Sequence, residues 1–370
     1  MTHLLDKKEL CFGCSACHDA CPVGAICMAA DSEGFAYPVI DQTLCTDCGA
    51  CLKVCPAQVV SGTDLAGGTG AVGQVKAYAL RCNDTELLKA STSGGAFSVL
   101  AQPVLESGGL VAGAAFDDNF QVKHLLADSI ESFRKSKYVQ SDASGIYKAV
   151  KSALGDGRKV LFSGTPCQCH ALLQLLGTQP DSLTVVSLVC RGVQSPGLWK
   201  AYTEHLSKNE ALSAYCFRDK RVQNDAHTVS YTAGGKEYAA AMNKDPFSIL
   251  YTKCLTLRPS CYTCPYTRPD LPFDITIGDF WGVEKVLPQF ADGRGTSLVL
   301  VRTARGKELL EKAVQNATAV EVPLEAATQT ALRTTVPKSM LRKFFFKQFA
   351  DLIQKGEDPI PFLLSKYGAT

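Results

Sequence analysis

Two runs of cysteines near the N-terminus have the residue type and the spacing of metal ligands. They read CFGCSACHDACP and CTDCGACLKVCP. Each follows the pattern C-x2-C-x2-C-x3-C-P, in which three closely spaced thiolates surround one metal cluster and a proline ends the run. The cysteines of the two runs are Cys11, Cys14, Cys17 and Cys21, followed by Cys45, Cys48, Cys51 and Cys55.

This duplicated pattern resembles the bacterial ferredoxin module that carries two [4Fe-4S] clusters. In that module the fourth cysteine of each run binds the cluster of the other run. Zinc knuckles or structural cysteines are the alternative, but two complete copies with their prolines favour iron–sulfur clusters. The resemblance implies one ligand set of Cys11, Cys14, Cys17 and Cys55, and a second of Cys45, Cys48, Cys51 and Cys21.

A second group of cysteines lies far apart in the remaining sequence. In SGTPCQCH, Pro166 suits the first position of a helix, so Cys167 lies in a first turn whose dipole and free amides favour a thiolate. Cys169 lies about 200° around the same helix and is not expected to share a ligand with Cys167. The pair Cys261 and Cys264 in RPSCYTC is compatible with zinc, a redox dithiol or iron–sulfur. A four-thiolate site needs two more sulfurs, for which Cys167 and Cys190 are the best candidates.

Cys27 is expected to be a small buried apolar residue. The remaining cysteines are expected to be buried or incidental thiols, namely Cys82, Cys169, Cys216 and Cys254.

Two glycine-rich segments raise the question of nucleotide binding. In KASTSGGAFSVL, hydroxyls and glycines precede a helical pattern, which fits ordinary capping and a phosphate site about equally well. The polar residues of this segment and its glycines are Ser91, Thr92, Ser93, Gly94 and Gly95. Residues 61–74 contain Gly68, Gly70 and Gly73 in a formal G-x-G-x-x-G, but no strand precedes them, so we interpret this segment as a linker.

Apolar runs alternate with helical patterns from residue 75 onward. The segments VKAYALRC, GLVAGAAFD, KVLFSG, LTVVSLVC, DITIGDF and SLVLVRT predict strands. Gly234 and Gly235 predict the turn of an antiparallel hairpin. The predicted fold is α+β or α/β: a small dicluster ferredoxin-like domain, then a larger layered α/β domain with a mixed sheet. Helices are expected near residues 95–107, 144–154, 166–176, 195–208 and 245–254.

The bulk composition is that of an ordinary soluble protein. The 370 residues carry a formal charge of +2, which does not favour nucleic acid or an anionic membrane as partner. No apolar run approaches the roughly 18 residues of a membrane span, and the charged N-terminus does not read as a signal peptide. We therefore expect a cytoplasmic protein, with a homo-oligomer possible.

Several motifs together resemble the coenzyme F420 hydrogenase/dehydrogenase beta subunit family over roughly residues 75–320. They are ASTSGGAFSVL, SKYVQSD, LFSGTPCQCHALL, VCRGVQSPGLW, FRDK, RPSCYTC and DITIGDFWG. The resemblance implies FAD beside a third [4Fe-4S] cluster, held by Cys167, Cys190, Cys261 and Cys264. It implies flavin contacts from the 91–95 loop and from Lys137, Tyr138, Gln140, Gly164, Thr165, Lys220, Asp279 and Trp281. Trp281 as a packing residue and Arg218 with Asp219 as a surface pair are equally compatible alternatives.

The resemblance implies an iron–sulfur flavoprotein oxidoreductase. Electrons are expected to come from reduced ferredoxin or a partner subunit and to reach a small molecule or a deazaflavin. Lys137 and Tyr138 are the candidate proton donors, with His227 a weaker one. A non-catalytic electron-transfer subunit of a larger complex is the alternative function. The predicted divisions are a ferredoxin-like domain at 1–60, a linker at 61–74, two parts of the core at 75–155 and 156–325, and a helical tail at 326–370.

Overall fold

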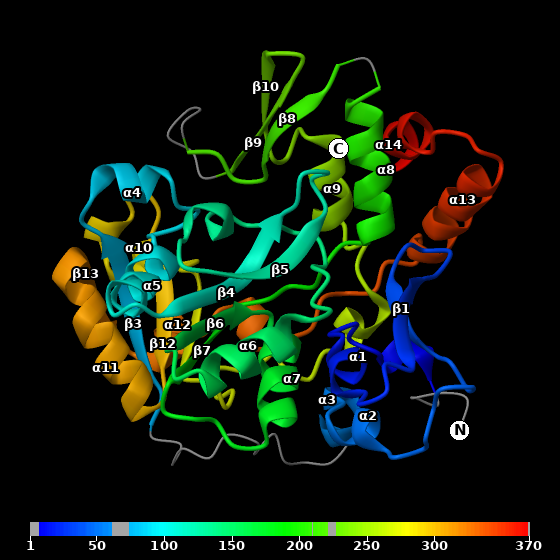
Figure 1. The fold of residues 1–370 in the computed structure, drawn as a ribbon. Helices are drawn as coiled ribbons and strands as arrows, with labels where there is room; N and C mark the ends of the chain where they lie inside the picture. Colours follow the sequence, from blue (N-terminus) through cyan, green and yellow to red (C-terminus); the bar gives the residue numbers. More distant parts are fainter. Residues whose placement is uncertain (1–6, 61–73, 209, 221–226, 369–370) are drawn as a thin grey trace.

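The computed structural model describes residues 7–60, 74–208, 210–220 and 227–368 (Figure 1). It is a mixed α/β structure with a small ferredoxin-like part at the N-terminus, which confirms the predicted fold class. The segment 61–73, which holds the predicted linker and its G-x-G-x-x-G, lies outside the described residues. None of the described helices is both long and apolar enough to span a membrane.

An eight-stranded sheet forms the centre of the molecule, in the order β13-β3-β12-β11-β7-β6-β4-β5. The four strands β4, β6, β7 and β11 run parallel, and the remaining pairings are antiparallel. Strands from both predicted parts of the core therefore share one sheet. The strands are β3 (Lys76–Cys82), β4 (Leu110–Phe116), β5 (Val122–Ala127), β6 (Val160–Gly164), β7 (Leu183–Leu188), β11 (Ile275–Asp279), β12 (Ser297–Val301) and β13 (Ala317–Val322).

Helices cover both faces of this sheet because successive side chains of a strand point to opposite faces. Leu161 of β6 packs in one apolar core, together with residues of helix α5 (Ala96–Glu106). Its neighbour Phe162 packs in a second apolar core on the other face of the sheet. Both cores are apolar, which is why the central strands read as continuous hydrophobic runs. The helices are α5 (Ala96–Glu106) and α11 (Ala304–Ala313) on the first face, and α6 (Ile146–Gly155) and α7 (Pro166–Leu176) on the second.

A second sheet of three strands projects above the first (Figure 1). It consists of β8 (Leu212–Cys216), β9 (Thr228–Ala233) and β10 (Lys236–Ala241). Gly234 and Gly235 have φ values of +56° and +76° and join β9 to β10, which confirms the predicted hairpin. The nearby helices are α8 (Pro196–Leu206), α9 (Pro246–Thr252), α13 (Arg342–Gln354) and α14 (Ile360–Tyr367). Elsewhere in the core, the short helices are α4 (Thr85–Lys89), α10 (Val283–Val286) and α12 (Leu324–Ala327).

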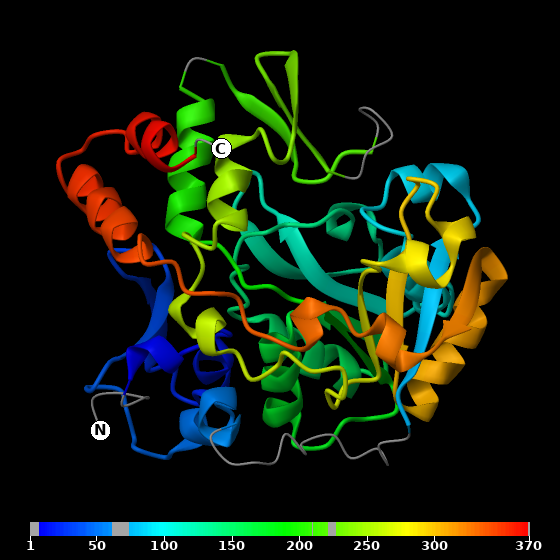
Figure 2. The ribbon, with the colours of Figure 1, turned by 180° about the vertical axis from the view of Figure 1, so that it is seen from behind.

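The N-terminal module packs against helices α6 and α7 of the core. Asp19 of the module accepts hydrogen bonds from the N–H groups of Gly145 (2.7 Å) and Tyr147 (3.0 Å), so it caps helix α6. Figure 2 shows the module and α13 side by side, and Glu33 bonds Arg342 there at 2.9 Å. The module consists of α1 (Ala16–Ala20), β1 (Ile26–Ala30), β2 (Ala36–Ile40), α2 (Ala50–Lys53) and α3 (Pro56–Val60).

Candidate redox site

A small cavity in the N-terminal module is lined by four cysteines from both runs. They are Cys11, Cys14, Cys17 and Cys55, the set that the ferredoxin resemblance implies for one cluster. Cys17 and Cys55 are buried, and burial raises the pKa of both thiols. The packing thus brings Cys55 of the second run beside three cysteines of the first.

Of the other four module cysteines, Cys21 is buried, and Cys45 and Cys51 are half-buried. Cys21, Cys45 and Cys51 pack in one apolar cluster, whereas Cys48 is exposed. Burial raises the pKa of Cys51, and the neighbouring thiols of Cys48 and Cys21 add to this shift. Cys27 was expected to be buried, and this is wrong: it is exposed, because it follows the buried Ile26 on β1 and successive side chains of a strand point to opposite faces.

Four cysteines from distant parts of the core line a second, larger cavity of about 320 Å³: Cys167, Cys190, Cys261 and Cys264. Cys167 starts α7 directly after β6, and Cys190 follows β7, the neighbour of β6 in the sheet. The carboxyl ends of parallel strands meet at one edge, where open α/β sheets bind ligands. Cys261 and Cys264 reach that edge from the 3-10 turn Pro259–Thr263 and the residue after it.

Burial raises the pKa of all four of these thiols, and neighbouring thiols add to the shift at Cys190, Cys261 and Cys264. The pKa of Cys261 is about 11, and that of Cys264 is about 12. At Cys167 the expected stabilisation of a thiolate is outweighed by burial, although Thr165 and Arg258 lower the pKa. Buried thiolates of this kind need a metal as their charge partner, so metal binding would release protons.

The donor geometry fits iron–sulfur clusters. Backbone N–H groups donate to cysteine sulfur from Gly13 to Cys11 (3.4 Å), from Ala25 to Cys21 (3.2 Å) and from Gly192 to Cys190 (3.3 Å), the type of bond that tunes a cluster. Among the described residues, no three His, Cys, Asp or Glu side chains are placed to hold a single metal ion. A zinc ion brings four sulfurs within about 4 Å of one another, whereas a four-iron cluster holds its ligands further apart.

Cys169 lies apart from this group, as the helical geometry predicts. Its side chain is fully buried, and its thiol lies 3.5 Å from the Gly164 carbonyl oxygen. It does not line the larger cavity, whereas Cys167 does. The helix therefore presents one of the two cysteines to the site and the other to the core.

The larger cavity also brings together most of the residues predicted to contact a flavin. Residues at the ends of β6, β7 and β11 line it together with residues of the 91–95 loop and the 134–138 segment. The predicted residues that line it are Ser91, Thr92, Ser93, Gly95, Lys137, Tyr138, Gln140, Gly164, Thr165 and Asp279. The loops are tied together, because Ser136 N donates to Thr92 Oγ1 at 2.9 Å.

Three of the predicted flavin contacts do not line the cavity. A side chain at Gly94 would collide with the backbone of Leu80 and Ser297, so this glycine permits close packing of the sheet. Trp281 is 57% exposed, and its ring packs on His227 at a centroid distance of 5.4 Å. His227 does not line the cavity either.

The third of these residues, Lys220, does not line the cavity but bonds to the 91–95 loop, which does. Its Nζ donates to the carbonyl oxygen of Ser93 and lies 3.3 Å from that of Leu88. Burial lowers the pKa of Lys220 to about 8. Lys220 therefore holds the 91–95 loop in place rather than facing the cavity.

Arg218 and Asp219 are buried, so the interpretation as a surface pair is wrong. Arg218 Nη1 lies 2.6 Å from Asp279 Oδ2 and donates to the Tyr138 hydroxyl at 3.1 Å. Asp219 accepts from Ser230 at 2.6 Å. These bonds connect the small sheet to the end of β11 beside the cavity.

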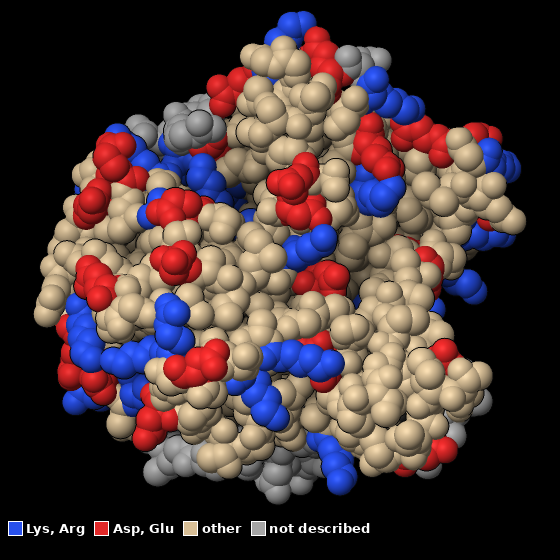
Figure 3. All heavy atoms as spheres, in the orientation of Figure 1, with Lys and Arg blue, Asp and Glu red and all other residues tan. Residues whose placement is uncertain are grey.

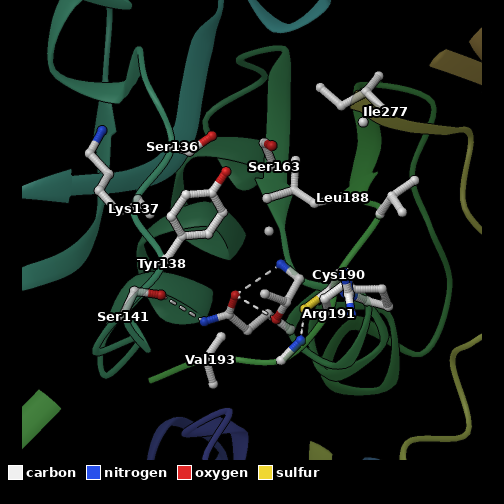
Figure 4. Close-up of a pocket in the computed structure, with 18 of the residues that line it drawn as sticks. Ser136, Lys137, Tyr138, Ser141, Ser163, Leu188, Cys190, Arg191, Val193 and Ile277 are labelled. Atoms are coloured by element: carbon white, nitrogen blue, oxygen red, sulfur yellow. Dashed lines mark hydrogen bonds between the residues drawn. The ribbon is translucent and has the colours of Figure 1, made fainter. Parts of the chain in front are cut away.

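Lys137 and Tyr138 point in different directions (Figure 4). The Lys137 side chain extends away from the middle of the pocket, and its Nζ donates to the carbonyl oxygens of Ser132 and Arg134, both at 2.9 Å. Burial lowers the pKa of Lys137 to about 7. The Tyr138 ring points into the pocket and stacks on Tyr251 at 5.0 Å.

Sequence reasoning missed three cations that line the cavity: Arg134, Lys135 and Arg191. Their signal was present, because two lie in the SFRKSKYV segment and the third in VCRG. Asp279 is the one carboxylate among the described lining residues. On the face shown in Figure 3, acidic and basic side chains are interspersed, so the excess of positive charge is a local feature of the cavity.

Comparisons with known proteins match two separate segments of the chain. Residues 10–59 match the 4Fe-4S dicluster domain, and residues 157–326 match the family described as the C terminus of the coenzyme F420 hydrogenase/dehydrogenase beta subunit. No sequence among the curated proteins matches. Among solved structures, a chain of the F420-reducing [NiFe] hydrogenase complex from Methanosarcina barkeri, studied by xenon derivatization, is similar with a TM-score of 0.46 and 20% identity, over 78% of this chain and 91% of that one. Residues 10–59 are therefore a 4Fe-4S dicluster domain, and residues 157–326 belong to the coenzyme F420 hydrogenase/dehydrogenase beta subunit family.

Proposed function

We propose that the chain is an iron–sulfur flavoprotein oxidoreductase. It takes electrons from reduced ferredoxin or a partner subunit and delivers them to a small molecule or a deazaflavin of the F420 type. The two family matches support the coarser statement, an iron–sulfur electron-transfer protein. The observation that supports the fuller proposal is the larger cavity, because the four core cysteines and the 91–95 loop line it together.

The cysteines would hold three [4Fe-4S] clusters in the sets already described. Such clusters supply one-electron transfer, with potentials set by burial and by hydrogen bonds to sulfur. Cys14 of the first module set packs in one apolar cluster with Cys167 and Cys264 of the core set, together with Tyr147 and Tyr266. This shared packing supports electron transfer between the first module set and the core set.

The 91–95 loop and the start of α5 would hold the phosphates of FAD, a cofactor that supplies hydride chemistry. Gly95, at φ +84°, is the N-cap of α5 and has no side chain to cap it; in the first turn, Ala96 N donates to Ser297 Oγ at 3.4 Å. Its first-turn residues line the cavity, so their backbone N–H groups and the helix dipole favour an anion there. Arg134 and Lys135 also line the cavity and add positive charge to it.

Tyr138 is the better of the two predicted proton donors. Arg218 donates a hydrogen bond to its oxygen, which leaves the Tyr138 hydroxyl proton free for a group in the cavity. The amine of Lys137 is engaged by two carbonyl oxygens and turned away. We therefore assign proton transfer to Tyr138 and a structural role to Lys137.

Anaerobic purification followed by iron and flavin analysis tests this function. We expect about twelve irons and one FAD per chain, from three four-iron clusters. A protein with about eight irons, or one that binds no FAD when FAD is supplied, would contradict the proposal. Complete loading without turnover of any small molecule or deazaflavin, in the presence of reduced viologen, would instead indicate an electron-transfer subunit.

A further inference from the structure

Arg258 is a fully buried arginine at the contact between the module and the core, with 0% of its surface exposed. Its Nε donates to the carbonyl oxygen of Cys11 at 2.7 Å, and its Nη2 to that of Ala36 at 3.1 Å. Its Nη1 donates to Gln140 Oε1 at 2.9 Å. The guanidinium therefore fixes the loop at the start of the first cysteine run. Arg258 also lies directly before the 3-10 turn that carries Cys261.

No carboxylate of the described residues forms an ion pair with Arg258. Its other neighbours are the rings of Tyr37, 4.2 Å from the guanidinium carbon, and Phe35, at 5.5 Å. Burial of a charge costs several kcal/mol unless an opposite charge compensates it. Neutral carbonyl groups and aromatic faces reduce this cost but do not supply that charge.

Arg342 provides an internal comparison. It is also buried, at 7% exposure, and also joins module to core, through Glu33 and the carbonyl oxygen of Leu257. Unlike Arg258, Arg342 is paired with a carboxylate, because it forms a bidentate ion pair with Glu33. The fold thus uses two buried arginines at one interface and gives only one of them a counter-ion from the described chain.

The negative charge missing at Arg258 is available on the two neighbouring cysteine sets. On the core side, Arg258 directly precedes the 3-10 turn Pro259–Thr263, and its carbonyl oxygen accepts a hydrogen bond from Cys261 N at 3.0 Å. It also bonds the backbone of Cys11, a residue of the first module set. Arg258 therefore lies within electrostatic reach of thiolates on both sides of the interface.

We propose that Arg258 is the shared counter-charge of the first module cluster and the core cluster, and that it raises the reduction potential of both. The inference rests on the proposed function, because it requires both clusters. Reduction adds one electron and no proton, so the cluster becomes more negative by one charge. A fixed cation stabilises that reduced state more than the oxidised one.

The test is a redox titration of the full chain with dithionite as the reductant, in which electron paramagnetic resonance detects the reduced clusters. Arg258→Gln removes the charge and keeps a hydrogen-bond donor, and Arg258→Lys keeps the charge. Arg342→Gln is the matched control at the same interface. We expect Arg258→Gln to lower both midpoint potentials by 59 mV or more, a tenfold change in a one-electron equilibrium, and the other two variants to stay near the wild type.

Unchanged potentials in fully loaded Arg258→Gln, or an equal shift in Arg342→Gln, would overturn the inference. Should Arg258→Gln fail to assemble its clusters, iron content decides. Retention of iron by Arg258→Lys then supports a need for charge, whereas equal loss in both variants shows that only hydrogen-bond geometry matters. Wild-type protein with about eight irons is a separate result, because it would remove the third cluster and thus the proposed function itself.

Discussion

The two cysteine regions are built in opposite ways. In the N-terminal module each proposed ligand set comes from a local run plus one cysteine of the other run, so the cysteine pattern together with the ferredoxin resemblance groups the thiols. In the core, Cys167, Cys190, Cys261 and Cys264 are spread over about a hundred residues. The adjacency of β6, β7 and β11 brings them to one sheet edge. A local motif can therefore be read from the sequence directly, whereas the second site requires the topology.

The two cysteine regions also differ in how deeply their cysteines are buried. Cys48 of the second module set is exposed, whereas the core set lies in a cavity beside the predicted flavin residues. The first module set lies between the two, under Arg258 and Gln140. This order suits an electron route that enters at the module and ends in the core.

Removal of one core ligand gives the largest expected effect. Cys264→Ser should reduce iron content from about twelve to about eight per chain, because a four-iron cluster needs its fourth thiolate. The module clusters should remain, since their ligands are independent of residue 264. Iron analysis and the absorbance near 400 nm measure this.

Cys169→Ser is the matched control for this prediction. Cys169 lies two residues from a predicted ligand on the same helix but faces the core. Its iron content should equal that of the wild type. Equal iron loss in both variants would mean that any change in this region unfolds the site, and unchanged iron in Cys264→Ser would exclude the core cluster.

The residues that sequence analysis found are those with a chemical type or a local pattern. The cysteine runs, the start of α7 at Pro166 and the hairpin at Gly234 and Gly235 all belong to this class. Lys220 and Arg258 were misjudged or missed because their partners are backbone carbonyls from distant segments. No periodicity or spacing encodes such contacts, which exist only after the sheet and the module have assembled.

Two glycines of the module allow a comparison between a loop that packs against the core and a loop that does not. Gly13 and Gly49 both have positive φ, +62° and +71°. A side chain at Gly13 would collide with Gln140 and Arg258, whereas one at Gly49 would meet open space. We expect Gly13→Ala to destabilise the protein by about 2–4 kcal/mol, from backbone strain plus collision in a packed interface. Gly49→Ala should cost only about 1 kcal/mol, from backbone strain alone.

Thermal unfolding of both variants at matched iron content measures this difference. Because Gly13 lies in the interface with the core, its variant should also release the module to proteolysis more readily. Equal destabilisation would show that the interface adjusts to the added methyl group without cost.

A smaller effect is expected at the support of the 91–95 loop. Lys220→Met removes the bond to the Ser93 carbonyl and keeps an unbranched side chain of similar length. The loop should lose its fixed position, and FAD affinity should fall about tenfold, which corresponds to roughly 1.4 kcal/mol, near the lower end of what a hydrogen bond to a charged group contributes. Flavin fluorescence titration measures the dissociation constant.

Lys89→Met serves as the control, because Lys89 lies on the neighbouring helix α4 but is exposed and bonds only Glu86. Its FAD affinity should match that of the wild type. A Lys220→Met protein with unchanged affinity would place the flavin phosphates away from this loop.

The smallest predicted effect concerns acid sensitivity of the core. His124 is buried beside the cavity, and burial lowers its pKa to about 4. Its Nε2 lies 3.1 Å from the Ser163 carbonyl oxygen, so that nitrogen carries the proton and Nδ1 accepts from Ser141 (2.8 Å). Ser141 in turn accepts from Gln168, which caps helix α7 in the turn that holds Cys167. The neutral ring therefore supports the start of α7.

Because the folded pKa lies below the unfolded value of about 6.5, the unfolded chain binds a proton that the folded chain does not. Stability from this group is complete above that value and is lost as the pH falls toward 4. Between pH 7 and 5.5 the loss should be about 1 kcal/mol. His124→Gln should remove this part of the pH dependence in urea unfolding curves, whereas His205→Gln, at a surface pair with Asp358, should not. An unchanged slope in His124→Gln would mean that the ring accepts a proton without disturbing α7, and that acid sensitivity does not distinguish the core site from the module.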